Sequence, residues 1–248
     1  MSIYKITPSS SQLATATVSG SVTSYAPEVQ NRLLVTGSSY GMLDDDGYDT
    51  VHVSTVPGTT VVTLPTTPSN NPGRIITVRN TGTGTLIVGG GGATIDGDAS
   101  IYLYQTNEAV TVICDGTNWY IQNANWFTTK GEAPTGAALT NLDAATFSDV
   151  IYIRTDKDTV QISGRCDFDP TVANVESSVE FTPSIIGTNG FLNASDAAGV
   201  GGTTAIDDLL RAALQANTGT NRLFLRAKST GATGSFAILF TGSYVLNH

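Results

Sequence analysis

The feature of this sequence that most constrains its fold is a series of short apolar runs, each closed by a turn signal. Between residues 41 and 123, apolar side chains alternate with polar ones, as at Val110 and Val112. Dipeptides such as Asp96-Gly97 separate the runs and favour tight turns. Alternation places every second side chain on one face of a strand, so this part of the chain is predicted to form a β-sandwich or a small barrel.

The composition supports the same fold class. Gly, Thr and Ser together make up 84 of the 248 residues, whereas Lys occurs only 4 times. Thr is β-branched and suits a pleated surface, and Gly supplies the backbone freedom that turns require, so the chain is predicted to be all-β.

Charge and hydropathy exclude several classes of protein. The formal charge of −9 and a pI near 4.5 argue against binding of nucleic acid through its phosphates, and Arg222, Arg226 and Lys228 are interpreted as the solvated face of one strand. No stretch approaches the roughly 18 apolar residues of a membrane span. The residues after Met1 lack the apolar segment that a secretory signal sequence needs. We therefore expect a soluble protein without membrane insertion.

The pattern changes along the chain and suggests four parts. Residues 1–40 are rich in Ser and Thr and poor in large apolar groups, which favours an N-terminal docking arm or, alternatively, a frayed terminus. Residues 41–123 form the middle β-domain, residues 124–145 show no sustained period and are interpreted as a linker, and residues 146–248 carry a second series of strands.

One segment of the second series leaves helix and strand open. Ile206, Leu209, Leu210, Ala213 and Leu214 follow a helical period, whereas residues 212–217 face residues 222–228 across a turn, as in a β-hairpin. We expect a short helical turn near 205–209 that leads into a strand.

An ordered set of motifs resembles a β-domain of tailed-bacteriophage virion structural proteins. The set consists of Leu64-Pro65, Gly73-Arg74, Ile95-Asp96-Gly97 and Asp115-Gly116-Thr117-Asn118-Trp119, within residues 49–122. This resemblance implies a fibre, spike or decoration protein of the virion without catalytic activity.

The last hundred residues resemble the jelly-roll domains that close many phage fibre and decoration proteins. The resemblance rests on Val160–Arg165, on the turn Thr218–Asn221 and on the ending Phe240–Leu246. Because such domains are often trimeric, it implies a homotrimer.

Two groups of residues could in principle carry metal or acid–base chemistry. The acidic segment Asp44–Asp49 could hold calcium, or it could simply be an acidic turn. Glu176 and Glu180 are the only close pair of Glu residues and would share one face of a strand. That face could carry the two carboxylates of a depolymerase site, or it could simply face solvent.

The other candidate residues have structural interpretations. His52 and His248 have no partner in sequence for a zinc or nucleophilic site, and Cys114 and Cys166 are expected to be buried thiols rather than a disulfide. The run Gly89–Gly92 is a turn, because no Lys-Ser/Thr follows it.

Aromatic side chains point to contacts between surfaces. Tyr102 and Tyr104 would share one strand face, and Trp126-Phe127 falls in the expected linker. Such side chains serve either an intersubunit or interdomain contact, which we favour, or a receptor site.

The sequence therefore predicts a noncatalytic, trimeric structural protein located in the virion, with no catalytic, cofactor-binding or metal-binding residues assigned. Its partners would be other virion proteins, reached through the N-terminal arm, and a host-surface glycan or protein. The alternatives are a cellular glycan-binding or adhesin module and a tail-associated polysaccharide depolymerase.

Overall fold

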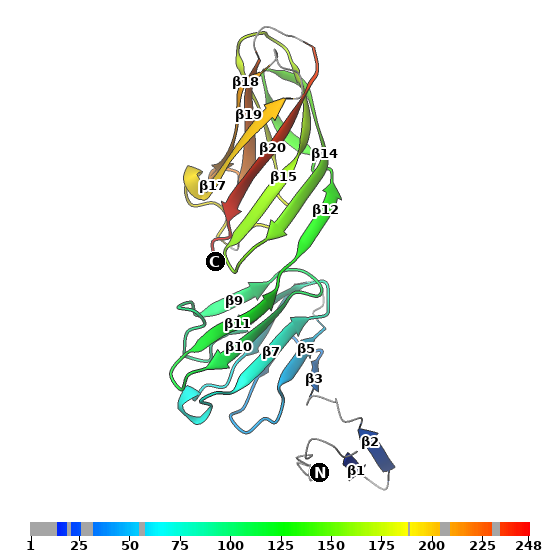
Figure 1. The fold of residues 1–248 in the computed structure, drawn as a ribbon, viewed down its shortest axis with the longest axis vertical. Coiled ribbons are helices and arrows are strands. Elements are labelled where there is room, and N and C mark those ends of the chain that lie inside the picture. Colours follow the sequence, from blue (N-terminus) through cyan, green and yellow to red (C-terminus); the bar gives the residue numbers. More distant parts are fainter. Residues whose placement is uncertain are drawn as a thin grey trace. The chain divides into compact units, whose positions relative to one another are not determined.

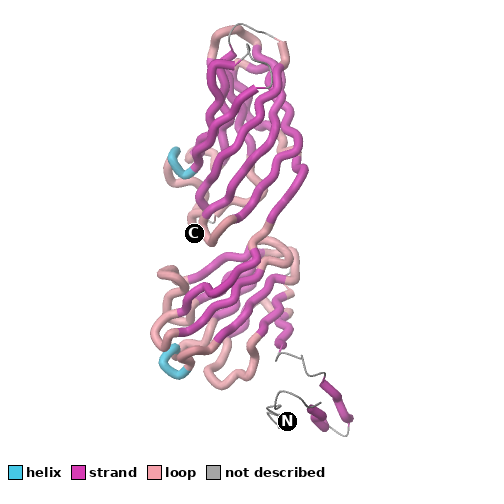
Figure 2. Tube along the Cα trace, viewed as in Figure 1, coloured by secondary structure: helices cyan, strands magenta, loops and turns pink. Residues whose placement is uncertain are grey.

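The structure is a computed structural model that describes residues 14–18, 21–25, 32–54, 58–187, 189–203, 209–229 and 234–248. The described residues are mostly in strands, and the helical elements among them are two short 3-10 helices (Figure 2). These are η1 (Pro68–Asn70) and η2 (Ala194–Asp196). The all-β prediction is confirmed, and the chain divides into two compact units between Asn125 and Trp126.

The expected docking arm is shorter than residues 1–40. Strands β3 (Arg32–Val35) and β4 (Ser39–Gly41) already belong to the sheets of the first unit. Before them, β1 (Ala14–Val18) and β2 (Ser21–Tyr25) form an antiparallel hairpin. Residues 1–13, 19–20 and 26–31 lie outside the described part of the chain, so the docking role stays a prediction.

Besides the β1–β2 hairpin, the first unit contains two larger sheets, one of five strands in the order β11-β10-β7-β5-β3 and one of four in the order β4-β6-β8-β9 (Figure 1). The strands not yet given are β5 (Thr50–Val53), β6 (Thr59–Thr63), β7 (Ile75–Asn80), β8 (Thr85–Gly89), β9 (Ser100–Leu103), β10 (Ala109–Cys114) and β11 (Trp119–Asn125).

The chain winds between these two sheets in a regular way. Strands β3, β5 and β7 pair in parallel in one sheet, and β4, β6 and β8 pair in parallel in the other. The pairs β3–β4, β5–β6 and β7–β8 each contribute one strand to either sheet, and we call each such pair a rung. The rungs are stacked, with Leu33, Val51 and Val78 in register. The later strands β9, β10 and β11 pair antiparallel and close the stack at its other end.

The core of the first unit lies between the two sheets, as the alternation predicts. Val53, Val62, Ile76, Val88 and Leu103 come from five different strands and are fully buried. Burial of such side chains stabilises the fold by roughly 1.5–3 kcal/mol each. Thr63, Thr77 and Tyr102 alternate with them and are half-buried.

The second unit is one nine-stranded antiparallel sheet in the order β12-β14-β15-β20-β17-β18-β19-β16-β13. Its strands are β12 (Thr128–Glu132), β13 (Gly136–Thr140), β14 (Leu142–Arg154), β15 (Thr159–Pro170), β16 (Glu176–Phe181), β17 (Ala197–Thr203), β18 (Leu209–Asn217), β19 (Arg222–Ser229) and β20 (Phe236–Val245).

This sheet curls over its own core. Phe147 on β14 and Phe181 on β16 lie far apart in the strand order, yet their ring centroids are 4.5 Å apart. Phe240 packs 6.2 Å from both rings. The curl turns one face of the sheet inward, which gives the jelly-roll-like β-sandwich architecture expected for this part of the chain.

Two expectations about local structure differ from the fold. Strands β12 and β13, together with the start of β14 at Leu142, occupy most of residues 124–145, which we interpreted as a linker. The sequence missed β13 because its side chains are mostly exposed. Residues 209–217 form strand β18, hairpin-paired with β19, so the strand expected there is confirmed. The helical turn near 205–209 lies mainly outside the described residues.

Candidate functional site

The outer face of the second unit carries a cross-strand group of charged and polar side chains. Every second residue of β16, β19 and β18 faces this side of the sheet. These residues lie next to one another across the strands, because β16 pairs with β19 and β19 pairs with β18. In register, Ser178 lies opposite Arg226, which lies opposite Ala213. The prediction that Glu176 and Glu180 share a strand face is consistent with this register.

The two glutamates of β16 have different surroundings. Glu180 is buried, and its carboxylate accepts hydrogen bonds from Asn217 Nδ2 at 2.8 Å and from Thr220 Oγ1 at 3.0 Å. Arg222 lies 3.6 Å from the same carboxylate. Glu180 therefore connects the β18–β19 turn to β16 through hydrogen bonds, which is a structural role.

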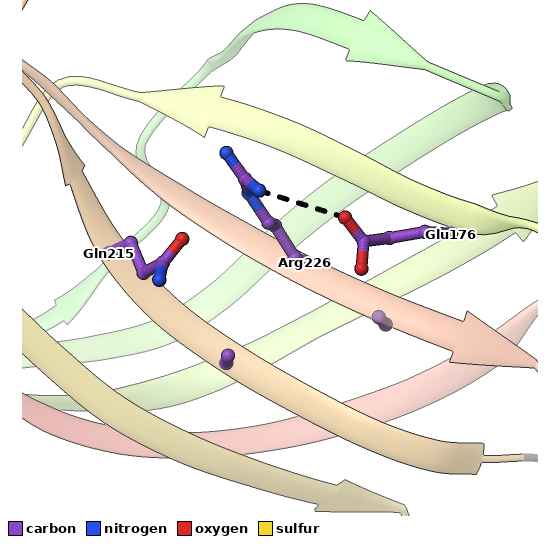
Figure 3. Close-up of a pocket in the computed structure, with 5 residues that line it drawn as sticks. Glu176, Gln215 and Arg226 are labelled. Atoms are coloured by element: carbon purple, nitrogen blue, oxygen red, sulfur yellow. Dashed lines mark ion pairs between the residues drawn. The ribbon is translucent and has the colours of Figure 1, made fainter. Parts of the chain in front are cut away.

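Glu176 is exposed and borders a shallow pocket of about 170 Å³ (Figure 3). Gln215 and Arg226 line the same pocket, with Ala213 and Ala227. Arg226 Nη1 lies 3.7 Å from Glu176 Oε1, which is an ion pair but longer than a hydrogen bond. Figure 3 shows this pair beside the Gln215 amide.

The basic residues of β19 lie outward, as the sequence predicts. Arg222 and Arg226 each face a glutamate of β16, and Lys228 lies opposite Glu176 in register. The Arg226 guanidinium also lies 4.8 Å from the centre of the Phe224 ring. The positive charge of this strand is therefore balanced locally rather than forming a basic surface.

A second part of the same outer face is apolar. Val200 on β17 and Leu239 on β20 are 67% and 50% exposed. Val200 lies opposite Thr241, two residues from Leu239 on the paired strand, so the two side chains are diagonal neighbours. Sequence analysis missed this patch, because alternation alone assigns apolar residues to the core.

The acidic segment Asp44–Asp49 surrounds an arginine. Arg74 donates hydrogen bonds to the carbonyl oxygens of Leu43 at 3.2 Å, Asp44 at 3.0 Å and Asp46 at 2.5 Å. Carbonyl oxygens of this kind are calcium ligands in other proteins. Here the guanidinium of Arg74 contacts them, so the structure favours the acidic-turn interpretation over calcium.

Side chains close this turn as well. Asn70 and Asn71 donate to the two carboxylate oxygens of Asp44, each at 3.0 Å, and these bonds lower the pKa of Asp44. Burial and the hydrogen bond to Asp46 raise the pKa of Tyr40 to about 12. In the described part of the chain, no three His, Cys, Asp or Glu side chains gather as a metal site.

The aromatic candidates make contacts within their own units. Tyr102 and Tyr104 share a face of the β9 edge and stack with ring centroids 6.0 Å apart. The Arg154 guanidinium lies 4.2 Å above the Trp126 ring, and Phe127 is buried. Trp126 is therefore part of the second unit, not of a linker.

The remaining candidates have structural surroundings. Cys114 and Cys166 are free and buried, and burial raises the pKa of the Cys166 thiol. His52 is half-buried on β5, and His248 contacts the carbonyl oxygen of Lys157 at 3.4 Å. Burial lowers the pKa of both histidines.

The glycine run begins in β8, whose last residue is Gly89, and the turn predicted there lies at Gly91 and Gly92. These two glycines have φ of +67° and +98°. A Cβ atom on Gly91 would meet the backbone of Leu64 and Pro65, so this position requires glycine.

No protein-family model and no curated protein matches this chain. Among the described residues, no helix has the length and the apolar character needed to cross a membrane. The resemblance to phage virion proteins thus rests on the motifs of the sequence.

Proposed function

We propose that this protein is a noncatalytic structural component of a tailed-bacteriophage virion, a fibre, spike or surface decoration that assembles as a homotrimer. Its N-terminal residues would attach it to other virion proteins, and the exposed part would contribute to host attachment. The proposal takes its virion context from the ordered motifs between Leu64 and Trp119.

The observation that carries the proposal is the apolar patch formed by Val200 and Leu239. Neighbouring exposed apolar side chains are a feature of surfaces that another molecule covers, so these two residues support a contact between subunits here. The outward neighbours on β17 are Ala198 and Gly202, which are small and leave this face flat. A flat apolar sheet face suits the close packing of identical subunits about a symmetry axis.

The glutamates of β16 support a noncatalytic role. Glycoside hydrolysis needs two carboxyl groups that both reach the scissile bond. Glu180 is instead buried beneath the β18–β19 turn and accepts hydrogen bonds from Asn217 and Thr220. Its carboxylate therefore stabilises the fold and is not presented to a polysaccharide.

Two measurements test the proposal. Size-exclusion chromatography with light scattering should give three times the chain mass of 25.8 kDa, whereas a clean monomer at micromolar concentration would remove the trimer. Electron microscopy of phage particles labelled through His248 should place the label on the virion surface. Unlabelled particles, with the protein left in the host lysate, would contradict the virion role.

Deletion of residues 1–31 tests the attachment segment separately. Because β3 begins at Arg32, this deletion removes the β1–β2 hairpin but leaves the five-stranded and four-stranded sheets of the first unit complete. The shortened protein should remain trimeric but be lost from particles. If it still enters particles, the attachment surface lies in the two folded units.

A further inference from the structure

We propose that the pocket lined by Glu176, Gln215 and Arg226 binds one neutral sugar ring of a surface glycan. This inference deepens the proposed function, because it assigns a place on the protein to host attachment. It depends on the geometry of three adjacent strands, which the sequence alone does not bring together.

The first support is an unused donor. The Nε–H of Arg226 is buried and has no hydrogen-bond partner among the described residues. A buried donor without an acceptor costs roughly 1–3 kcal/mol, so such groups are normally paired. Arg226 lines the pocket and its side chain is 39% exposed, so a shift of the guanidinium would bring this N–H to a ligand oxygen in the pocket.

The charges select the chemistry of the ligand. Glu176 and Arg226 carry opposite charges 3.7 Å apart, so an anion would face Glu176 and a cation would face Arg226. A pair of sugar hydroxyls avoids both conflicts, since each hydroxyl donates and accepts. One hydroxyl can donate to Glu176 while its neighbour accepts from Arg226, and the Gln215 amide adds a donor and an acceptor.

The apolar surroundings suit the carbon face of a sugar ring. Phe224 lies opposite Gln215 in register, is half-buried and contacts the Arg226 guanidinium with its ring. Ala213 supplies a methyl group to the pocket lining. Phe224 lies next to Gln215 and Arg226 but outside the pocket lining, which itself combines the methyl groups of Ala213 and Ala227 with hydrogen-bonding groups. Sugars likewise are apolar on one face and polar at the edge.

The size of the pocket limits the ligand. Its volume of about 170 Å³ is below the roughly 300–1,000 Å³ of pockets that enclose drug-sized molecules. It therefore suits a single ring, either a chain end or one unit of a longer glycan. Binding at one such open site should be weak, in the millimolar range, and several sites in one assembly would raise the avidity.

Saturation-transfer NMR on the full-length protein tests this site. The probes are the methyl glycosides of glucose, galactose and N-acetylglucosamine, each at about 10 mM, which detects millimolar affinity. Glucuronic acid serves as the anionic probe, and an acetylated and amidated triglycine serves as the peptide probe. We expect transfer to at least one neutral glycoside and weaker transfer to both other probes.

Variants locate the binding. Gln215→Ala and Arg226→Met should each weaken binding about tenfold, because each removes hydrogen bonds to the ligand. Arg165→Met is the matched control, since it removes an exposed arginine from another ion pair of the same unit, Arg165–Asp167 at 2.8 Å. Gln215 is exposed, so its variant should keep the thermal stability of the wild type even if Arg226→Met lowers it.

Three outcomes would overturn the inference. They are no transfer to any neutral glycoside, binding that both pocket variants leave unchanged, and a preference for the anionic or peptide probe. Light scattering on the same samples separates this inference from the proposed function. A trimer without sugar binding would remove only the pocket assignment, whereas a sugar-binding monomer would remove only the trimeric fibre.

Discussion

Gly199 on β17 and Gly242 on β20 lie directly opposite each other. A Cβ atom built on Gly199 would lie 2.5 Å from the carbonyl oxygen of Thr241 and 2.8 Å from the Cα of Gly242. Leu214 packs over both glycines, with atoms 3.0 Å from either Cβ position. The pairing of these two strands beneath Leu214 therefore depends on the absence of side chains at both positions.

Gly199→Ala should destabilise the second unit. The added methyl group meets backbone atoms, which cannot move aside as a flexible side chain does, so we expect a loss of about 1–3 kcal/mol in the free energy of unfolding. Urea denaturation followed by circular dichroism measures it. Gly202→Ala on the same strand is the control, because its Cβ position is open, and equal effects of both substitutions would contradict the packing argument.

Arg74→Met should destabilise the acidic turn of the first unit. The variant leaves the carbonyl oxygens of Leu43, Asp44 and Asp46 without their common donor, and we expect a loss of roughly 1–3 kcal/mol. Thermal unfolding detects the loss. The wild-type melting temperature should not rise when calcium is added, because the guanidinium contacts these oxygens, and a calcium-dependent rise would revive the calcium interpretation.

Val200→Asp should convert the proposed trimer into monomers. An aspartate beside Leu239 would have to lose its hydration in the proposed contact between subunits, which is costly for an unpaired charge. Light scattering gives the mass of the variant. Val172→Asp changes a valine that is 50% exposed outside the strands and should leave the mass unchanged; an unaltered trimer in Val200→Asp would place the interface elsewhere.

The stability of the protein should fall as the pH decreases from 7 to 5. Burial, together with Arg32 and Arg79, lowers the pKa of His52 in the folded state. The unfolded chain, with a histidine pKa of about 6.5, then binds more protons in this window, so unfolding becomes easier as the pH falls through it. Lowering of the pKa of His248 acts in the same direction.

His52→Gln tests this assignment. The variant should show a smaller decrease in melting temperature between pH 7 and pH 5 than the wild type, with His248 accounting for what remains. Carboxylates with lowered pKa, such as Asp44, affect stability mainly below about pH 5, so they contribute little in this window. An identical pH profile in the variant would show that His52 has no part in it.

The fold class follows from the sequence because alternation is a local property. The alternation around Val110 and Val112 identifies them as inward-facing residues of a strand, whichever strands lie beside it. Both side chains are buried. Alternation does not say which strand lies next to which. The parallel stacking of β3, β5 and β7 therefore could not be predicted from it, since those strands are separated by a strand of the other sheet each time.

The candidate site depends on register between distant segments. Glu176 and Arg226 are 50 positions apart and meet only because β16 pairs with β19 in one particular alignment. The short spacing of Glu176 and Glu180 in the sequence suggests that both carboxylates belong to one site. In the structure Glu176 is exposed, whereas Glu180 is buried by its tertiary contacts. Sequence spacing identified the right strand but not the partners of its side chains.

The two-strand rungs of the first unit also bear on how such a protein could change in length. Each rung needs only the backbone of the rung before it, and the loops that join successive rungs differ in length without disturbing the register of Leu33, Val51 and Val78. Duplication of one rung would therefore insert a further layer and extend the body while both closing ends keep their original neighbours. A lineage that carries this design could adjust its reach through small insertions in the gene, with no need to invent a new core.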